Sequence, residues 1–332
     1  MPFSSLTLRA PPNPFLPPSL PHLLLTTPLK TLLRLLDYLT TLLRTHPSPL
    51  HPPIRLICIA DTHTLIPSRI PPGDLLIHAG DLTNAGTPAD LHAQIAWLAA
   101  LPHEHKVVIA GNHDTFLDPR SRRTLSPSDQ QGPIDWNGIT YLQHASTTLH
   151  FASGRSLRLH GAPQIPACGG PEHAFQYPRG ADAWSDTIPD DTEVLITHTP
   201  PKYHLDLPAA LGCEHLLREV WRVQPALHVF GHVHAGRSDL MGWLRAGREV
   251  VRWDGRQAVV ERGLGRPTGF WREVLDPRGW ADLVRVVVHG VVGAVWTRVW
   301  GGQKPGTTVM VLASLMWCDS GVLGNEAQVV EL

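Results

Sequence analysis

The sequence is short of cysteine and of charge, and each shortage excludes a class of protein. Its four cysteines are widely separated in 332 residues and show no CxxC spacing, so reduced thiols and a cytoplasmic location are expected. Charged residues make up 17% of the chain and the formal net charge is −1, so no nucleic-acid partner is expected and any charged partner must be met locally. The length suits one domain with additions and a sizeable core.

The amino terminus also lacks the basic start and apolar core of a signal peptide, because prolines interrupt "RAPPNPFLPPSLPHLLLTTPLK", so secretion is not expected. Residues 28–45 predict an amphipathic helix, with Thr27 as its cap, Pro28 at the first position and leucines at helical spacing. Packing of this helix on the main domain is the simpler interpretation. "HPSPLHPP" then breaks the chain, so residues 1–53 form a proline-rich extension and a domain is expected to begin near Ile54.

What the chain does contain is a repeated pattern of short apolar runs that end in Asp, Asn or His. The runs are "RLICIADTH", "DLLIHAGD", "KVVIAGNHD", "EVLITHTPP" and "ALHVFGHVH". Nearly continuous apolar strands imply burial on both faces, and "TPADLHAQIAWLAAL" between two of them has helical spacing, so parallel βαβ units are predicted. Because ligands gather at the carboxyl ends of such strands, the polar residues are expected to converge on one site.

The residue types at these ends predict metal binding. Carboxylate, amide oxygen and imidazole together suit a divalent transition metal, whereas Mg or Ca would use oxygen alone and a structural zinc site would favour thiolates. The candidate ligands are Asp61, His63, Asp81, Asn112, His198, His232 and His234. They are too many for one ion, but two metals about 3.5 to 4 Å apart that share a carboxylate would use them all and would suit displacement at phosphorus.

In chain order the same residues form a set of motifs with a known resemblance. They are DxH at 61–63, GD at 80–81, GNHD at 111–114, a His before Thr-Pro at 198, and GHxH at 231–234. The ordered set resembles that of the calcineurin-like metallophosphoesterases, and "GDLLIHAGDLTNAG", "LPHEHKVVIAGNHD" and "LGCEHLL" resemble the brain-type metallophosphoesterase-domain proteins and their fungal relatives. The likeness covers residues 54–238, with closing strands expected over 306–332.

The resemblance implies an α/β fold, a four-layer αββα sandwich, and a role for each site residue. It implies Asp61, His63 and His234 on one divalent ion, Asn112, His198 and His232 on the other, and Asp81 as the bridge, with Mn, Fe or Zn as the metals. It further implies a metal-bridging hydroxide as nucleophile. His113 would protonate the leaving oxygen or stabilise phosphoryl charge, with a purely supporting histidine as the alternative.

Departures from better-known relatives narrow the expected subclass. The Ser/Thr protein phosphatases carry an aspartate three residues after the bridging one, and purple acid phosphatases carry a ligand tyrosine there, whereas this chain has Asn84. Some brain-type relatives have glycine in place of His232, so this copy looks catalytically intact. The expected function is a phosphodiesterase on cyclic nucleotides or similar diesters; the alternative is a membrane-apposed scaffold or nucleotide-binding protein with a vestigial metal site.

Three further features are candidates for parts of the site. His78 lies inside a predicted strand and is better interpreted as a buried, hydrogen-bonded histidine than as a ligand. Arg179 in "YPRG" is a candidate phosphate contact, because guanidinium offers a bidentate fork, although loop arginines are more often structural. The glycine- and proline-rich loop over 161–180 is expected to wall the site.

Residues 241–305 are expected to be a basic, tryptophan-rich insertion after the core of residues 54–240. They hold six of the eleven tryptophans and more basic than acidic residues, but their longest uncharged run, Val286 to Thr297, is too short to span a bilayer. Tryptophan and arginine around such a run predict an element in the headgroup plane of an anionic membrane, and packing on the core is the alternative. Residues 306–332 then predict a closing strand pair, with Leu312 where brain-type relatives carry asparagine.

Overall fold

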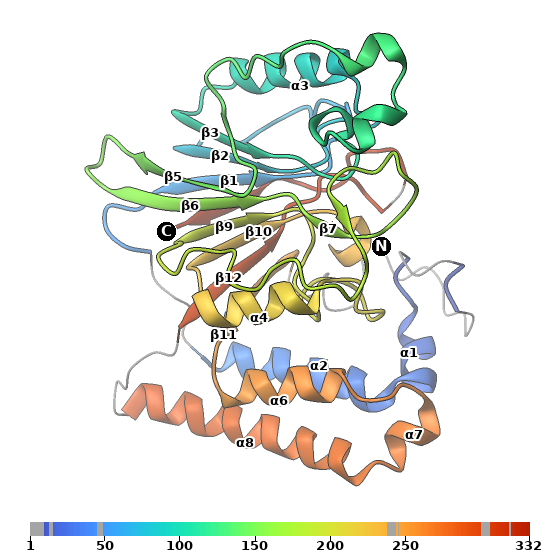
Figure 1. The fold of residues 1–332 in the computed structure, drawn as a ribbon. Helices are drawn as coiled ribbons and strands as arrows, with labels where there is room; N and C mark the ends of the chain where they lie inside the picture. The colour runs from blue at the N-terminus through green and yellow to red at the C-terminus, as the bar shows by residue number, and fades with distance from the viewer. Residues whose placement is uncertain are drawn as a thin grey trace.

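Two β-sheets stacked face to face form the centre of the molecule (Figure 1). The structure is a computed structural model and describes residues 10–12, 16–44, 49–237, 244, 246–299, 306–318 and 320–332. Helix α3 (Pro88–Ala100) covers the outer face of one sheet, and α4 (Glu214–Val223) covers the outer face of the other. The four-layer α/β sandwich predicted from the sequence is confirmed.

The first sheet has the strand order β13-β1-β2-β3-β4. Its strands are β1 (Arg55–Ile59), β2 (Leu75–Ala79), β3 (His105–Ile109), β4 (Thr140–Tyr141) and β13 (Gln328–Glu331). Strands β1 to β4 are parallel, and β13 closes the edge antiparallel to β1. Successive residues of β1 face opposite layers: Leu56 and Cys58 pack between the sheets, while Ile57 and Ile59 pack under α3.

The second sheet has the order β11-β12-β10-β9-β6-β5. Its strands are β5 (Ala145–His150), β6 (Ser156–Ala162), β9 (Val194–Thr197), β10 (Leu227–Phe230), β11 (Arg248–Arg252) and β12 (Thr307–Leu312). The four central strands are parallel and the two edge strands antiparallel. A small pair, β7 (Ile165–Pro166) and β8 (Gln176–Tyr177), and 3-10 turns at Thr115–Leu117, Ser121–Thr124, Pro127–Gln130 and His234–Arg237 lie in the connections.

The closing segment differs from the expected strand pair. Strands β12 and β13 both form, but β12 pairs with β10 and β11 in the second sheet, whereas β13 pairs with β1 in the first. Between them the chain crosses from one sheet to the other, where Ser314 bridges to Ala60 beyond the end of β1. The two closing strands expected from the sequence therefore form, but they do not pair with each other, because only tertiary pairing decides which sheet each one joins.

Residues 20–42 and 255–299 together form a second body of helices, called here the helical subdomain, below the second sheet in Figure 1. It contains α1 (Leu20–Thr26), α2 (Pro28–Leu42), α6 (Gly255–Leu264), α7 (Phe270–Val274) and α8 (Pro277–Val299). Leu29 and Leu33 of α2 pack with Val260 of α6 and Val286 of α8. The amino-terminal helix therefore buries its apolar face mainly against the late insertion.

Helix α8 is longer than the uncharged run of the sequence indicates. It has 23 residues, and its stretch Pro277–Trp296 is long and apolar enough by composition to cross a membrane, with 28% of that stretch buried. The uncharged run Val286 to Thr297 is by itself too short to span a bilayer, but the helix that contains it extends further towards its amino-terminal end. Core helices of soluble proteins can have the same length and composition, but most residues of this helix are exposed.

Candidate active site

The carboxyl ends of five central strands bring six of the seven candidate ligands into two adjoining groups. One group holds Asp61, His63, Asp81 and His234, and the other holds Asp81, His198 and His232. Within each group the potential ligand atoms all lie within 4.8 Å of one another. Asp81 belongs to both groups, which is the geometry that a carboxylate shared by two ions requires.

Asn112 joins the second group. Its side-chain oxygen lies 3.1 Å from Nε2 of His198, and the next backbone N–H, that of His113, donates to Oδ1 of Asp81 over 2.8 Å. All seven residues predicted as ligands are thus near one another in the structure, at the edge where β1, β2 and β3 of one sheet meet β9 and β10 of the other.

Hydrogen bonds to carbonyl groups fix two of the imidazole rings. Nδ1 of His198 lies 2.9 Å from the carbonyl of Ala79, and Nδ1 of His234 lies 2.9 Å from the carbonyl of Cys318. A carbonyl only accepts, so Nδ1 carries the proton and Nε2 is left for a metal. Nε2 of His234 also faces Nε2 of His63 at 3.1 Å, an approach that requires a proton or a cation between the two nitrogens.

Three motif glycines are needed because side chains of the site touch their backbone. A Cβ on Gly111 would lie 2.2 Å from Oδ1 of Asp81, and one on Gly231 would lie 2.6 Å from Oδ2 of Asp61. A Cβ on Gly80 would lie 2.5 Å from Nδ1 of His198, at a φ of +95° that also favours glycine. The glycines of GD, GNHD and GHxH therefore allow the side chains of His198, Asp81 and Asp61 to pack directly against the backbone.

The backbone at the site is strained. Asp61, His63, Asp81 and His232 all have positive φ, between 46° and 68°. Such conformations cost about 1–3 kcal/mol each in non-glycine residues and persist only where the surroundings hold them. Here the N–H of Asp61 donates to the carbonyl of Gly80, that of His63 to the carbonyl of Asp81, and that of His232 to the carboxylate of Asp61. Positive φ also occurs elsewhere in the chain, but strained backbone at residues of this chemistry is typical of functional sites.

The charges of the site suit cations. Burial alone would raise the pKa of Asp61, but His234 and His198 outweigh it and hold that pKa at about 2; the pKa of Asp81 is likewise well below its usual range, chiefly because His198 offsets burial. Burial lowers the pKa of His232 to about 3, so its imidazole is neutral and able to bind a metal. Two buried carboxylates that stay ionised among imidazoles form a donor set that fits divalent transition metals.

Asp114, the last residue of GNHD, has a structural role instead. It is fully buried, and its carboxylate accepts from the backbone N–H groups of Gly111, Leu82 and Thr83 and from the Thr83 hydroxyl. Burial, and then the charge of Asp81, raise its pKa to about 6. These bonds tie the GD loop to the GNHD loop and so fix the position of Asp81.

His113 lies beside the ligands without belonging to either group. Its ring makes an edge contact with that of His63, with 4.8 Å between centroids, and its Nδ1 lies 3.0 Å from the carbonyl of Asn84. Nδ1 therefore carries a proton and Nε2 is the nitrogen left for a substrate. His113 lines a cavity of about 700 Å³ together with His63, Asn84 and His234.

His173 is a functional candidate that the sequence reasoning missed. Its Nδ1 accepts from the side-chain amide of Asn112 over 3.0 Å, and the N–H of the next residue, Ala174, donates to the Asn112 carbonyl. Its ring also contacts that of His113, with 5.1 Å between centroids. His173 lies in the loop expected to wall the site, but no spacing or motif in that loop distinguished it from the other histidines of the chain.

The two remaining candidates lie apart from the ligand groups. His78 is fully buried, its Nε2 bonds to the Thr62 hydroxyl over 3.0 Å, and burial lowers its pKa to about 4. The exposed guanidinium of Arg179 donates to the carbonyls of Ala167 and Leu211, which ties two loops together. Arg179 is not one of the described residues that line the cavity beside His113.

Comparisons with known proteins agree with this site. Residues 46–236 match the family model described as calcineurin-like phosphoesterase. A protein of Emericella nidulans named probable rhamnogalacturonate lyase C is 42% identical over 220 residues, which are 66% of this chain and 20% of that protein. Metallophosphoesterase domain-containing protein 1 of Homo sapiens is 37% identical over 206 residues, covering 55% of this chain and 61% of its own length.

A solved structure, that of TT1561 from Thermus thermophilus, aligns with 65% of this chain and 98% of its own, with a TM-score of 0.36 and 14% identity. The match to this chain spans a fifth of the length of the Emericella nidulans protein and about three fifths of the length of the human protein. The matched residues include every ligand candidate and His113.

Proposed function

We propose, from the premise that this chain belongs to the calcineurin-like phosphoesterase family, that it hydrolyses phosphoric esters with two divalent metal ions. The proposed substrates are phosphodiesters such as cyclic nucleotides, and the proposed metals are Mn, Fe or Zn. The observation that carries the proposal is Asp81, which belongs to both groups of potential ligands. A scaffold with a vestigial metal site would have no need of a complete, strained and ionised donor set.

The residues present fit this pair of ions. Asp61, His63 and His234 would hold one ion, and the set that would hold the other comprises Asn112, His198 and His232. Asp81 would hold both. Ions bound there would supply an activated water and neutralise charge on the phosphate. The hydrogen bonds from His198 and His234 to backbone carbonyls, and the close packing of site side chains against the three motif glycines, provide the fixed geometry that such a pair needs.

The other residues of the site would handle the substrate. His113, with Nε2 free to face the cavity, would hold a proton for the leaving oxygen. The cavity of about 700 Å³ has room for a diester as large as a cyclic nucleotide. Asn84 lies on its wall in the place where related phosphatases carry an ionic or phenolic residue, which supports a substrate class different from theirs.

The replacement Asp81→Asn tests the proposal. It should lower the metal content towards one ion or none, measured by mass spectrometry of the elements, and remove most hydrolysis of an aryl phosphodiester. Asp135→Asn, at an exposed position away from the cavity, is the matched control and should behave as the wild type. Two bound metals with normal turnover in Asp81→Asn would contradict the shared-carboxylate assignment.

We also propose a cytoplasmic protein that contacts an anionic membrane through α8. Val284, Val288, Val292 and Val299, at helical spacing, are each more than half exposed and form what we call the valine face. Trp280 and Trp296 lie towards the two ends of the helix, where interfacial tryptophans are common. Exposed arginines on α8, such as Arg278, add attraction to anionic lipid of about 1 kcal/mol per side chain near the surface.

Sedimentation with vesicles that contain phosphatidylserine tests the membrane contact. The wild type should bind at low salt and be released by salt, and Val288→Ser with Val292→Ser should weaken binding without disturbing the buried side of α8. Val322→Ser removes an equally exposed valine from a distant loop and is the control. A wild type that stays in the supernatant at low salt would leave α8 as an exposed packing helix only.

A further inference from the structure

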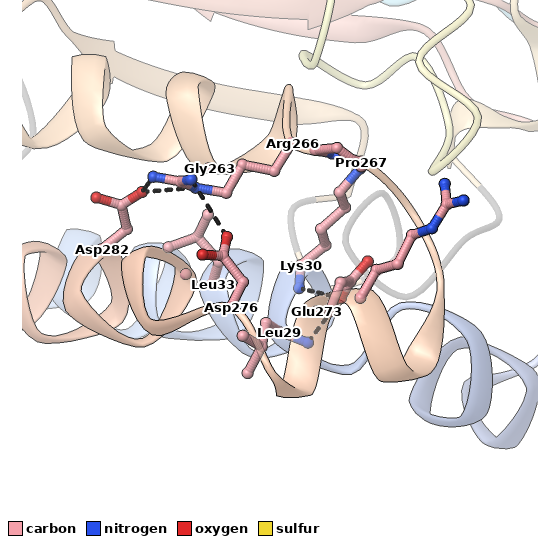
Figure 2. A pocket seen from close by; sticks show the side chains of 11 residues that line it. Leu29, Lys30, Leu33, Gly263, Arg266, Pro267, Glu273, Asp276 and Asp282 are labelled. Atoms are coloured by element: carbon pink, nitrogen blue, oxygen red, sulfur yellow. Dashed lines mark hydrogen bonds and ion pairs between the residues drawn. The ribbon is translucent and has the colours of Figure 1, made fainter.

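The helical subdomain contains a cavity that the proposed phosphoesterase activity does not use (Figure 2). Its volume is about 300 Å³, at the lower end of the range for small-molecule sites. It lies between the start of α2, the segment that joins α6 to α7, α7 itself and the start of α8. The residues that line it are Leu29, Lys30, Leu33, Gly263, Arg266, Pro267, Arg272, Glu273, Asp276, Gly279 and Asp282.

Most charges in this lining neutralise one another. Arg266 pairs with Asp276 at 3.2 Å and with Asp282 at 2.7 Å, as the dashed lines in Figure 2 show. Asp282 also pairs with Arg262 and Arg285. One side of the cavity is therefore a closed ionic network that has no need of a ligand.

Two adjacent residues of the lining, Arg272 and Glu273, take no part in this ionic network. Glu273 is 4% exposed; its Oε2 accepts from the backbone N–H groups of Leu29 and Lys30, but its Oε1 is buried without a hydrogen-bond partner among the described residues. Arg272 is exposed and has no hydrogen bond or ion pair in the described part of the chain, so its guanidinium is available to a ligand. A buried acceptor without a donor is costly, so the site is incomplete as it stands.

We propose that this cavity binds an aminoalkyl phosphate, either free or as a lipid headgroup. The ammonium donates to Oε1 of Glu273, and the phosphate accepts from Arg272. Lys30, whose ammonium bonds the Thr268 hydroxyl at 2.9 Å, adds positive charge beside the phosphate. Leu29, Leu33 and Pro267 supply apolar contact for the alkyl link. The proposal does not depend on phosphoester hydrolysis at the metal site.

Neighbouring side chains favour the lipid as the source. Trp271, next to Arg272, is 70% exposed, and Leu275, next to the lining residue Asp276, is 73% exposed. Trp280, next to the lining residue Gly279, is 47% exposed. Apolar side chains beside a headgroup-sized cavity would enter the interface of a bilayer while the headgroup fills the cavity.

Calorimetric titration of the full chain with phosphoethanolamine tests the proposed chemistry. Because this monoester can also bind the metal site, the relevant component is the one that Asp81→Asn retains. We expect phosphoethanolamine to bind at least tenfold more tightly than inorganic phosphate, ethanolamine or phosphocholine, whose quaternary ammonium has no N–H to donate. Equal affinity for phosphoethanolamine and inorganic phosphate would overturn the role of Glu273.

Three variants place the binding in this cavity. Arg272→Gln should weaken phosphoethanolamine about tenfold or more by removing a charge-assisted bond. Glu273→Gln keeps an oxygen for the N–H groups of Leu29 and Lys30 but replaces the other oxygen by an NH2 group, which cannot accept from the ammonium. It should therefore weaken binding to a similar extent. Arg278→Gln, an exposed arginine outside the lining, is the control. Unchanged affinity in Arg272→Gln and Glu273→Gln, or an equal loss in Arg278→Gln, would overturn the proposal.

Vesicles distinguish the two sources. At a fixed content of phosphatidylserine, replacing phosphatidylcholine by phosphatidylethanolamine should increase binding of the wild type but not of Arg272→Gln. If soluble phosphoethanolamine binds and the vesicles show no such preference, the free molecule is the ligand. If the protein does not bind phosphoethanolamine and shows no preference for vesicles with phosphatidylethanolamine, the proposed site is overturned.

Discussion

At the scale of single residues, the proposed roles separate the side chains that would hold metals from the one, His113, that would handle a proton. His113 directly follows the candidate ligand Asn112, but it belongs to neither group of potential ligands, and its ring bonds the Asn84 carbonyl. Its ring borders both His63 and His173 and faces the cavity. A proton donor in this position would act on the leaving oxygen, so the importance of His113 should depend on how good the leaving group is.

For His113→Ala we expect unchanged metal content and a loss of about 10² to 10⁴ in kcat for a phosphodiester with an alkyl leaving group. The loss should be much smaller for a nitrophenyl leaving group, which needs no proton. Steady-state rates with both substrates check this. Equal losses with the two would exclude proton donation and leave charge stabilisation as the role of His113.

His173 gives a second prediction at the scale of residues, because it orients the proposed ligand Asn112 and belongs to neither group of potential ligands. Its Nδ1 holds the Asn112 amide so that the amide oxygen faces His198. His173→Ala should weaken metal binding at the second position about 10- to 100-fold, as loss of an outer partner typically does. His173→Gln should restore part of it, since its side-chain oxygen can accept from Asn112. Competition with a metal-binding dye measures both, and equal affinities in wild type and His173→Ala would contradict the positioning role.

At the scale of elements, the sequence predicted what local pattern controls. The five apolar runs became five parallel strands because each is buried on both faces, and their polar ends met because parallel strands end at the same edge. Positive φ at Asp61 and Asp81 could not be foreseen, because no local rule places a non-glycine residue there. Nor could the partner of α2: its leucines predict a buried face, but periodicity does not say against which element.

That partner is fixed by a buried ion pair. Arg256 of α6 is 1% exposed and contacts Asp37 of α2 at 3.1 Å, and it also donates to the hydroxyls of Thr40 and Thr41. A cation removed from water in this way is tolerable only with all its partners in place. The pair therefore specifies how α2 sits on α6, which apolar contacts alone would leave free to slide.

We expect Arg256→Ala to lower the free energy of unfolding of the helical subdomain by about 3–5 kcal/mol, since it removes the cation of a buried ion pair and leaves the carboxylate of Asp37 in the interior. Urea unfolding followed by tryptophan fluorescence measures this. Arg278→Ala, at an exposed position of α8, is the matched control and should change stability by less than about 0.5 kcal/mol. A small effect of Arg256→Ala would mean that leucine packing alone holds the two helices together.

At the scale of the whole molecule, a buried ionic cluster joins the helical subdomain to the sandwich. His204, in the segment between β9 and α4, lies 3.3 Å from the carboxylate of Glu249 in β11 and 3.4 Å from that of Glu261 in α6. Trp221 of α4 donates to the other oxygen of Glu261 over 2.8 Å. One histidine thus connects the edge strand, the helical subdomain and the main domain.

This cluster predicts how stability depends on pH. Burial alone would lower the pKa of His204, but Glu249 and Glu261 outweigh it and raise that pKa to about 10, well above the usual histidine value of 6.5. The folded protein therefore keeps a proton that the unfolded chain releases above about pH 6.5. The stabilisation is complete below that pH and is lost as the pH rises through about 10, at up to about 1.4 kcal/mol per pH unit.

Between about pH 7 and about pH 9 the same effect is expected from His198, whose pKa is raised to about 9, so the contribution of His204 is the difference between the wild type and His204→Gln. The pKa of buried Asp206 is raised to about 6, so Asp206 is already ionised above about pH 7. Cys58 and Arg252, with pKa values of about 12 and about 10, affect stability mainly above about pH 9. The free energy of unfolding of the wild type, from urea titrations at several pH values, should fall across the interval. His204→Gln should be less stable at the neutral end and should show a clearly smaller slope, because glutamine has no proton to release while His198 is still present. Parallel curves for the two proteins would show that His204 is neutral in the folded state, and that hydrogen bonds rather than charge hold the helical subdomain to the sandwich.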